Sequence, residues 1–176
     1  MKDKVLEESF MTIFCGGLSS TLDTIAFITG DLKPDQVEPL TWALYEEGKQ
    51  RSASDYLRAL TILQRISRDI ARFFVEYDVL LTPTLSQPPV PLGTFDPTPE
   101  NPLLGMDRAA EFIPFTPICN MTGQPAMSVP LFWNNNNLPV GSHFIGRFGD
   151  EATLFRLASQ LEAARPWADR RPSVWA

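Results

Sequence analysis

Residues 119–147 read CNMTGQPAMSVPLFWNNNNLPVGSHFIGR, and this stretch decides how the rest of the chain is interpreted. It contains two short apolar runs, Ala126–Phe132 and Val140–Ile145, on either side of four consecutive asparagines. In the first run Met127 and Val129 share one face while the residues between them take the other, as in a half-buried strand. Asparagine tolerates the left-handed backbone of a tight turn. The stretch therefore predicts a β-hairpin.

The segment just before the hairpin is dense in residues that free or restrict the backbone. Gly123 allows conformations closed to other residues, and Pro125 fixes its own backbone and biases the residue before it towards an extended one. We therefore interpret both as backbone devices that end one element and direct the next.

The motifs in this region resemble the closing segment of the amidase signature hydrolases. That family typically reads N-x-T-G-x-P-A-x-S-x-P, then L-P-x-G, then glycine-arginine and an acidic start to the last helix. This chain reads NMTGQPAMSVP from Asn120, LPVGSHFIGR from Leu138 and DEATL from Asp150. Several patches thus occur in the order that the family has them.

Two further stretches extend the resemblance to residues 77–172. YDVLLTPT, which starts at Tyr77, is similar to the strand that the family writes D-x-L-L-x-P-T. PWADRRP, which starts at Pro166, is similar to bacterial amidases of the 6-aminohexanoate cyclic dimer hydrolase kind.

The resemblance implies an α/β fold, namely the C-terminal portion of the amidase signature fold with a mixed β-sheet flanked by helices. The expected order is a mostly helical N-terminal half, a strand, a proline-rich loop, the β-hairpin and a C-terminal helix. The resemblance also implies hydrolysis of a carboxamide C–N bond in the complete enzyme. Members of the family use a serine nucleophile, a bridging serine in a cis peptide and a lysine base, all upstream of the matched region. None of the three is identifiable in this chain, so we expect it to be inactive alone.

Length and composition favour one globular domain, residues 1–176, because 44% of the residues are hydrophobic. The net charge of −6 and the absence of a lysine or arginine run argue against nucleic acid or an anionic membrane as a partner. No segment approaches the roughly 18 apolar residues of a membrane span. Two distant cysteines and no apolar leader favour a cytoplasmic location.

Helical periodicity predicts most of the first half. We expect helices over Met1–Phe14 and Leu18–Thr29, separated where Gly16 and Gly17 follow each other, and a third from Glu38 to Gly48. A capping-box pattern, with Ser52 three residues before Asp55, precedes an apolar stripe at helical spacing that ends at Tyr77. That stripe predicts one helix of some 25 residues.

The second half is punctuated by prolines. Val79–Leu81 is short and uniformly apolar, which is typical of a central strand covered on both faces. Residues 82–102 are too rich in proline for regular structure and predict a long loop. Residues 111–118 indicate a loop and a short helix, and residues 150–164 a final helix with acidic residues at its start.

No complete active site is visible in the residues themselves. His143 is the only histidine and lies in mid-strand, and the chain contains no G-x-S-x-G nucleophile elbow. We therefore expect its ring to form a hydrogen bond with a neighbouring strand. Cys119 is interpreted as a small core residue, and Ser19-Ser20 lacks the glycine-serine context of the family's nucleophile. One histidine and two separated cysteines form no metal-ligand spacing. We expect no metal and no cofactor.

The resemblance places part of the substrate cleft in this region of the family. Residues in non-regular segments beside strand ends are then the candidates for contact with a small-molecule amide. These candidates are Cys15, Gly16, Pro83, Thr84, Ile118, Cys119 and Asn120.

The sequence thus favours part of a cytoplasmic amidase that pairs with the N-terminal portion of the enzyme or self-associates through an apolar face. One alternative is a stand-alone α/β small-molecule binding module, in which the proline tract and the segment Cys119–Pro125 frame a pocket without chemistry. The other is a non-catalytic truncated product.

Overall fold

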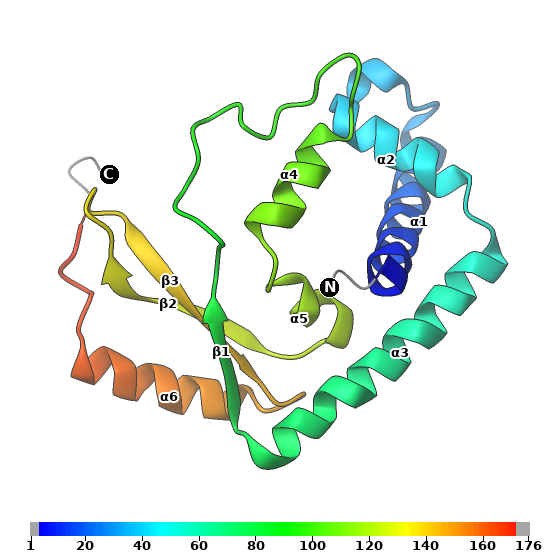
Figure 1. Cartoon of the computed structure of the whole chain (residues 1–176). Helices are drawn as coiled ribbons and strands as arrows, with labels where there is room; N and C mark the ends of the chain where they lie inside the picture. The colour runs from blue at the N-terminus through cyan, green and yellow to red at the C-terminus, as the bar shows by residue number, and fades with distance from the viewer. Residues whose placement is uncertain (1–3, 172–176) are drawn as a thin grey trace. The chain divides into compact units, whose positions relative to one another are not determined.

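The structure is a computed structural model that describes residues 4–171. The chain forms two units. The first runs to Arg68 and includes Val90–Glu111, and the second comprises Asp69–Pro89 and the chain from Phe112 onward. Figure 1 shows the helices and strands of both units. The single domain over residues 1–176 stays a prediction.

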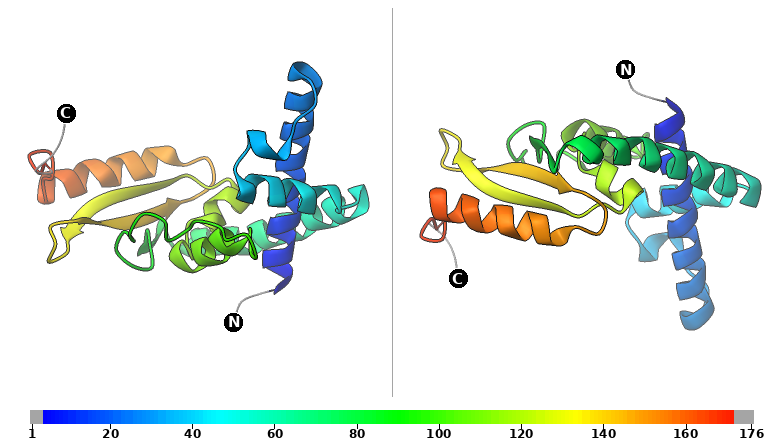
Figure 2. Two further views of the ribbon diagram at one scale, coloured as in Figure 1. Left: turned by 90° about the horizontal axis from the view of Figure 1, so that it is seen from above. Right: turned by 90° about the horizontal axis from the view of Figure 1, so that it is seen from below.

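The first unit is helical. Its helices are α1 (Lys4–Thr29), the short 3-10 helix η1 (Pro34–Gln36), α2 (Pro39–Lys49), the first part of α3 (Ala53–Glu76) and α4 (Leu104–Phe112). Helix α2 packs against α1 (Figure 2). The predicted start of α2 near Glu38 is confirmed, with Pro39 in its first turn, where the missing N–H costs nothing. Helix α4 was not predicted.

Helix α1 is continuous, so the prediction of two helices separated by Gly16 and Gly17 is wrong. Glycine inside a helix costs about 1 kcal/mol relative to alanine, which packing offsets here. A methyl group on Gly16 would lie 3.3 Å from the ring of Tyr56, so this glycine admits a close neighbour. The helix ends as predicted at Gly30, whose φ of 99° suits a C-terminal cap and whose N–H donates to Ala26 O at 2.9 Å.

Six hydroxyl groups of α1 donate hydrogen bonds within the helix. Ser9, Thr12, Ser19, Thr21, Thr24 and Thr29 each donate to the carbonyl oxygen four residues earlier. With 26 residues and a stretch of mean hydropathy 1.4, α1 also has the length and composition of a helix that could cross a membrane. The expectation that no segment reaches those values is therefore wrong, although core helices of soluble proteins reach them too.

Helix α3 confirms the predicted long amphipathic helix and its cap. Asp55 N–H donates to Ser52 Oγ at 3.1 Å, and the Asp55 carboxylate accepts from Ser52 N–H at 3.1 Å. The most buried side chains of the helix are Ala59, Leu63 and Phe74.

The second unit contains a three-stranded antiparallel sheet. Its strands are β1 (Val79–Pro83), β2 (Ala126–Trp133) and β3 (Pro139–Gly146), in the order β1-β3-β2. The predicted hairpin of β2 and β3 is confirmed. The strand after Asp78 also lies beside it, since Leu81 pairs with Phe144 of β3. Two helices complete the unit, α5 (Pro117–Thr122) and α6 (Glu151–Ala164).

Helix α6 lies along one face of the sheet (Figures 1 and 2). Val129, Phe144 and Leu154 form a buried apolar cluster there, and six partly buried side chains pack against it, namely Val79, Met127, Leu131, Leu157, Leu161 and Trp167. The helix starts as predicted, because the Asp150 carboxylate accepts from Thr153 N–H at 3.3 Å.

The predicted burial of the first strand on both faces is wrong for the described residues. Among residues 4–171, β1 is an edge strand rather than a central one, and the Leu81 side chain is 59% exposed. No helix or strand forms between Pro83 and Leu104, but Thr82 and Pro83, which the prediction placed in the proline-rich loop, belong to β1.

Candidate functional site

A row of polar side chains crosses the sheet of the second unit on the face opposite α6. Thr82, His143 and Ser128 are level with one another on β1, β3 and β2. Residues directly opposite each other in antiparallel strands project to the same face, whereas Phe144 projects to the α6 side. Thr82 Oγ1 and His143 Nδ1 share a hydrogen bond of 3.0 Å.

A second hydroxyl pair lies beside this row. Thr84 follows β1, and its N–H donates to Gly141 O at 3.1 Å. Thr84 Oγ1 and Ser128 Oγ are 2.6 Å apart and share a hydrogen bond. A methyl group on Gly141 would overlap both hydroxyls, so glycine on the central strand is what permits their contact.

The histidine is not arranged as a general base for a serine. The His143 side chain is 5% exposed, and burial lowers the pKa of its imidazole, because the charged form loses solvation. Among residues 4–171, His143 has no hydrogen bond to a serine, and Ser128 is bonded to Thr84 instead. The expectation that the ring would pair with a neighbouring strand is confirmed.

The segment before β2 forms a tight corner. Gly123 adopts a φ of 71° at the end of α5, and its N–H donates to Cys119 O at 2.9 Å. The buried Gln124 side chain donates to Gly146 O at 2.8 Å, which fixes the corner to the end of β3. Burial raises the pKa of the Cys119 thiol, whereas Asn120 is exposed. The interpretation of Gly123 as a backbone device fits this geometry.

The candidate residues of this unit fall into two groups. Pro83 and Thr84 lie where β1 ends, opposite Ser142 and Gly141 of β3. Ile118, Cys119 and Asn120 belong to α5, which leads into the opposite end of the sheet. Among residues 4–171 no hydrogen bond joins Thr84 to α5. Within the second unit, Ser86 N–H donates to Phe112 O at 3.0 Å.

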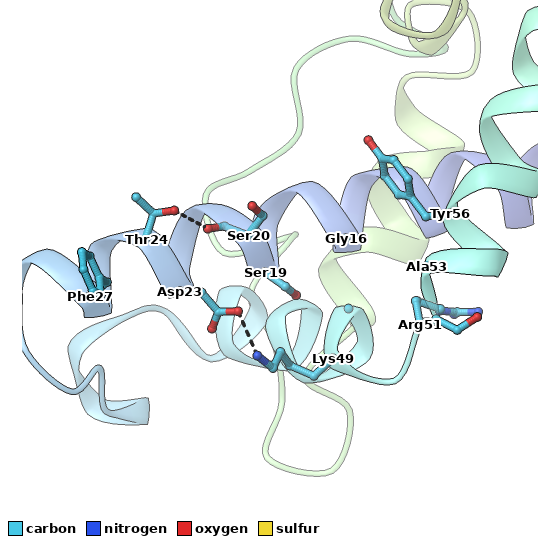
Figure 3. A pocket seen from close by; sticks show the side chains of 12 residues that line it. Gly16, Ser19, Ser20, Asp23, Thr24, Phe27, Lys49, Arg51, Ala53 and Tyr56 are labelled. Carbon is cyan, nitrogen blue, oxygen red and sulfur yellow. Dashed lines mark hydrogen bonds and ion pairs between the residues drawn. The ribbon is translucent and has the colours of Figure 1, made fainter.

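The first unit contains an open hollow of about 600 Å³, shown in Figure 3. Its walls come from α1, α2 and the start of α3. The polar groups at its centre are Asp23 and Lys49, whose Oδ2 and Nζ atoms are 2.8 Å apart. Tyr45 OH also donates to Asp23 Oδ1 at 2.7 Å.

The hollow does not hold a serine activated by a lysine. The hydrogen bond from Lys49 lowers the pKa of Asp23, and the same bond raises the pKa of Lys49, so the amine stays charged. A lysine that acts as a base needs a lowered pKa, so that its amine is neutral. Ser19 Oγ lies 2.9 Å from both Cys15 O and Tyr45 O, so its hydroxyl proton is donated to a carbonyl oxygen.

The other two candidate residues, Cys15 and Gly16, lie within α1 and not in the non-regular segment expected for them. The Cys15 side chain is 1% exposed, and burial raises the pKa of its thiol. Gly16 lines the hollow beside Tyr56. A substrate contact for either residue stays a prediction.

Sequence reasoning missed the Thr84–Ser128 pair and the Asp23–Lys49–Tyr45 cluster. The first follows from the strand register, which periodicity alone does not supply. The second joins residues 22 to 26 positions apart on two helices, and no local pattern marks such a contact. Within residues 4–171, no group of three histidine, cysteine or acidic side chains is placed to hold a metal.

Comparison with known proteins identifies a family model and several relatives that match this chain. Residues 5–155 match a family model described as Amidase. The chain is 34% identical over 170 residues to "Putative amidase AmiB2" of Mycobacterium bovis, covering 94% of this chain and 34% of that protein. It is 45% identical over 111 residues to "Putative amidase AmiC" of Mycobacterium leprae, covering 63% of this chain and 23% of that protein.

A solved structure of 6-aminohexanoate cyclic dimer hydrolase, complexed with substrate, has the same fold over this region. It superposes with a TM-score of 0.83 at 23% identity and covers 96% of this chain and 36% of that one. The resemblance inferred from the hairpin motifs is thereby confirmed. The chain spans about a quarter to a third of the length of the curated relatives it matches.

Proposed function

This chain belongs to the amidase family, and on that premise we propose that it forms part of an enzyme that hydrolyses a carboxamide C–N bond. The observation that carries the proposal is the family match over residues 5–155, which includes both the hollow and the polar row. The fold shared with 6-aminohexanoate cyclic dimer hydrolase supports it.

We further propose that the nucleophile and its base come from the polypeptide that the relatives have beyond the matched segment. Two features support this division. Lys49 is held as a cation by Asp23. The hydroxyls of Ser19 and Ser128 are hydrogen-bonded to a carbonyl oxygen and to another hydroxyl, neither of which can act as a base. This chain would then supply strands, outer helices and part of the substrate wall.

The substrate wall is proposed to include Pro83, Thr84 and the α5 residues Ile118, Cys119 and Asn120. Asn120 is exposed, and a carboxamide side chain both donates and accepts hydrogen bonds, as an amide substrate requires. Cys15 and Gly16 are kept as candidates in the first unit.

A chimera tests the function. We suggest replacing the 170-residue segment of AmiB2 that matches this chain with the chain itself. We expect the folded chimera to hydrolyse a simple aryl amide or a cyclic amide, and the isolated chain to hydrolyse neither. A folded chimera without turnover on a panel of linear, aryl and cyclic amides would count against the proposal, as would turnover by the isolated chain.

The substrate wall is tested in the same chimera. Asn120→Ala should raise KM for the amide by about tenfold, the value of one lost hydrogen bond of about 1.4 kcal/mol. Asn136→Ala, at the exposed hairpin tip, is the matched control and should leave KM unchanged. Equal kinetics for both variants would remove Asn120 from the wall.

We also propose a cytoplasmic location and a partnership with the remaining amidase polypeptide. Cys15 and Cys119 are both free thiols, which suits a reducing compartment. Fractionation of the native host with an antibody against residues 4–171 tests the location.

A further inference from the structure

Two hydroxyl groups from the outer strands of the sheet meet across its central strand. Thr84 follows β1 and Ser128 lies on β2, whereas β3 runs between these two strands. Outer strands of a three-stranded sheet are roughly 10 Å apart, so two short side chains on them do not ordinarily touch. Thr84 Oγ1 and Ser128 Oγ are nevertheless 2.6 Å apart, because Gly141 of β3 leaves the space that they occupy.

The pair carries one proton more than its own hydrogen bond uses. Each hydroxyl has one proton to donate and lone pairs that accept. One of the two protons lies in the bond between Thr84 and Ser128, and among residues 4–171 no hydrogen bond uses the other. A hydroxyl that accepts a hydrogen bond is a stronger donor, because the two bonds polarise each other. The pair can therefore donate one strengthened hydrogen bond to a group that residues 4–171 do not supply.

Exposure and anchoring indicate which hydroxyl makes that outward bond. Ser128 is exposed, whereas Thr84 is partly buried. The Thr84 backbone is fixed, since its N–H donates to Gly141 O at 3.1 Å, and a β-branched side chain has few rotamers. Thr84 is thus suited to donate to Ser128 Oγ and to orient it, which leaves the Ser128 proton for a ligand.

The surroundings of the pair suit a neutral ligand. Strands β1, β2 and β3 carry no carboxylate, lysine or arginine. His143, which lies opposite Ser128, is buried, and burial lowers the pKa of its imidazole, so the ring is neutral at pH 7. An ion bound here would lose solvation without gaining a charged partner. A carbonyl oxygen, in contrast, is a neutral acceptor that a single hydroxyl can satisfy.

We propose that Ser128 binds an amide substrate by donating a hydrogen bond to one of its carbonyl oxygens, and that Thr84 positions the Ser128 hydroxyl for this bond. The proposal rests on the proposed function, because it adds Ser128 to the substrate wall that already includes Thr84. The carbonyl belongs either to the amide that is cleaved or to a second carbonyl group of the same molecule. Ser128 binds and does not react, since within residues 4–171 neither hydroxyl of the pair is bonded to a base.

Deletion of single hydroxyls in the AmiB2 chimera tests the assignment. Ser128→Ala should raise KM by about fivefold with kcat unchanged, because a bond made equally to substrate and transition state affects only KM. Thr84→Val should also raise KM, and Thr84→Ser, which keeps the hydroxyl, should restore it. The matched control is Ser142→Ala on β3. Ser142 pairs with the buried Val129 and so projects to the α6 face, and its loss should leave KM unchanged.

Two anilides identify the carbonyl that is bound. N-phenylpentanamide has only the amide that is cleaved, whereas N-phenylbutanediamide carries a second carbonyl group. An effect of Ser128→Ala on both substrates assigns the bond to the cleaved amide, and an effect on the diamide alone assigns it to the second carbonyl. Either result supports the proposal. Equal KM values for Ser128→Ala and Ser142→Ala with both substrates would overturn it.

A binding measurement makes the test independent of turnover. Ligand-observed NMR gives the Kd of the chimera for N-phenylbutanediamide and for N-butylaniline, which has no carbonyl. Ser128→Ala should raise the Kd of the diamide by about fivefold and leave that of the amine unchanged. A chimera that shows this pattern without hydrolysing amides refutes only the proposed function.

Two other results would show that Ser128 has a structural role instead. A folded chimera that does not bind the diamide is one of them. The other is a Ser128→Ala variant that loses more stability to urea in the chimera than in the isolated chain, with both Kd values unchanged. Ser128 would then be bonded to the added polypeptide and not to a ligand, and the proposal would be wrong.

Discussion

At the scale of single residues, two helical glycines lie in very different surroundings. A methyl group on Gly48 of α2 would overlap the Ser19 hydroxyl and the Cys15 carbonyl oxygen, whereas one on Gly17 of α1 would meet nothing within 4 Å. Gly48 therefore sets how closely the two helices approach, and Gly17 contributes only a weak helix propensity.

Alanine substitutions should accordingly have opposite signs. Gly48→Ala should lower the free energy of unfolding by about 1–3 kcal/mol, because the overlap forces α2 away from α1. Gly17→Ala should raise it by up to about 1 kcal/mol. Urea unfolding followed by circular dichroism measures both, and a stabilising Gly48→Ala would show that α1 and α2 do not make this contact.

Burial of His143 should make the free energy of unfolding depend on pH. Burial lowers the pKa of its imidazole in the folded chain below the ordinary value of about 6.5, so the unfolded chain binds the proton more readily. The stability that neutral, buried His143 gives the folded chain is therefore fully present above the pKa that the imidazole has in the unfolded chain. This stability is lost as the pH falls from there through the lower pKa of the folded chain.

Since the chain has one histidine, His143→Gln should flatten this part of the pH profile while an amide still reaches Thr82. The measurement is the free energy of unfolding from pH 8 down to about pH 5. An unchanged slope in the variant would mean that another group causes the pH dependence.

At the scale of single elements, the cap of α3 is open to a direct test. Ser52→Ala removes the hydroxyl that accepts the first free N–H of the helix and should lower the free energy of unfolding by about 1 kcal/mol. Ser54→Ala, two residues later and exposed, is the control and should have little effect. If both variants unfold alike, the capping box does not form in solution.

The elements also show what the sequence could predict. The hairpin and α3 were predictable because a period of two or of three to four residues marks them directly, and their ends carry Gly, Pro or Ser signals. Helix α1 was misread because Gly16 and Gly17 look like a stop. The role of Gly16 depends on its neighbour Tyr56, which is distant in sequence.

The candidate site was less predictable for the same reason. The bond between His143 and its neighbour followed from its place in mid-strand, but Thr82 as the partner required the register of β1 on β3. Likewise β1 looked like a central strand from its apolar residues, although within residues 4–171 it has only one neighbour. The apolar composition of a strand does not by itself tell whether the strand has one neighbour or two.

At the scale of the whole molecule, large apolar side chains remain in solvent. Phe27, Val75, Phe155, Ile28 and Phe148 are each between 72% and 91% exposed. Large contiguous apolar patches mark surfaces that another protein covers, and side chains of this size and exposure can contribute to such patches. This agrees with a chain that spans about a third of AmiB2.

We therefore expect the isolated chain to self-associate. Its weight-average mass in sedimentation equilibrium should rise with concentration, and it should bind a dye that reports exposed apolar surface. In the AmiB2 chimera the same dye should bind less per molecule. A chain that stays monomeric and binds no dye would show that these side chains are covered in solution.

The internally bonded hydroxyls of α1 have one more consequence. Because Ser9, Thr12, Ser19, Thr21, Thr24 and Thr29 already spend their protons on the helix itself, a surface that settles over α1 need not supply acceptors for them. Water can leave these six hydroxyls without leaving a polar hydrogen unpaired, so a surface that covers them needs to match their shape and need not accept hydrogen bonds from them.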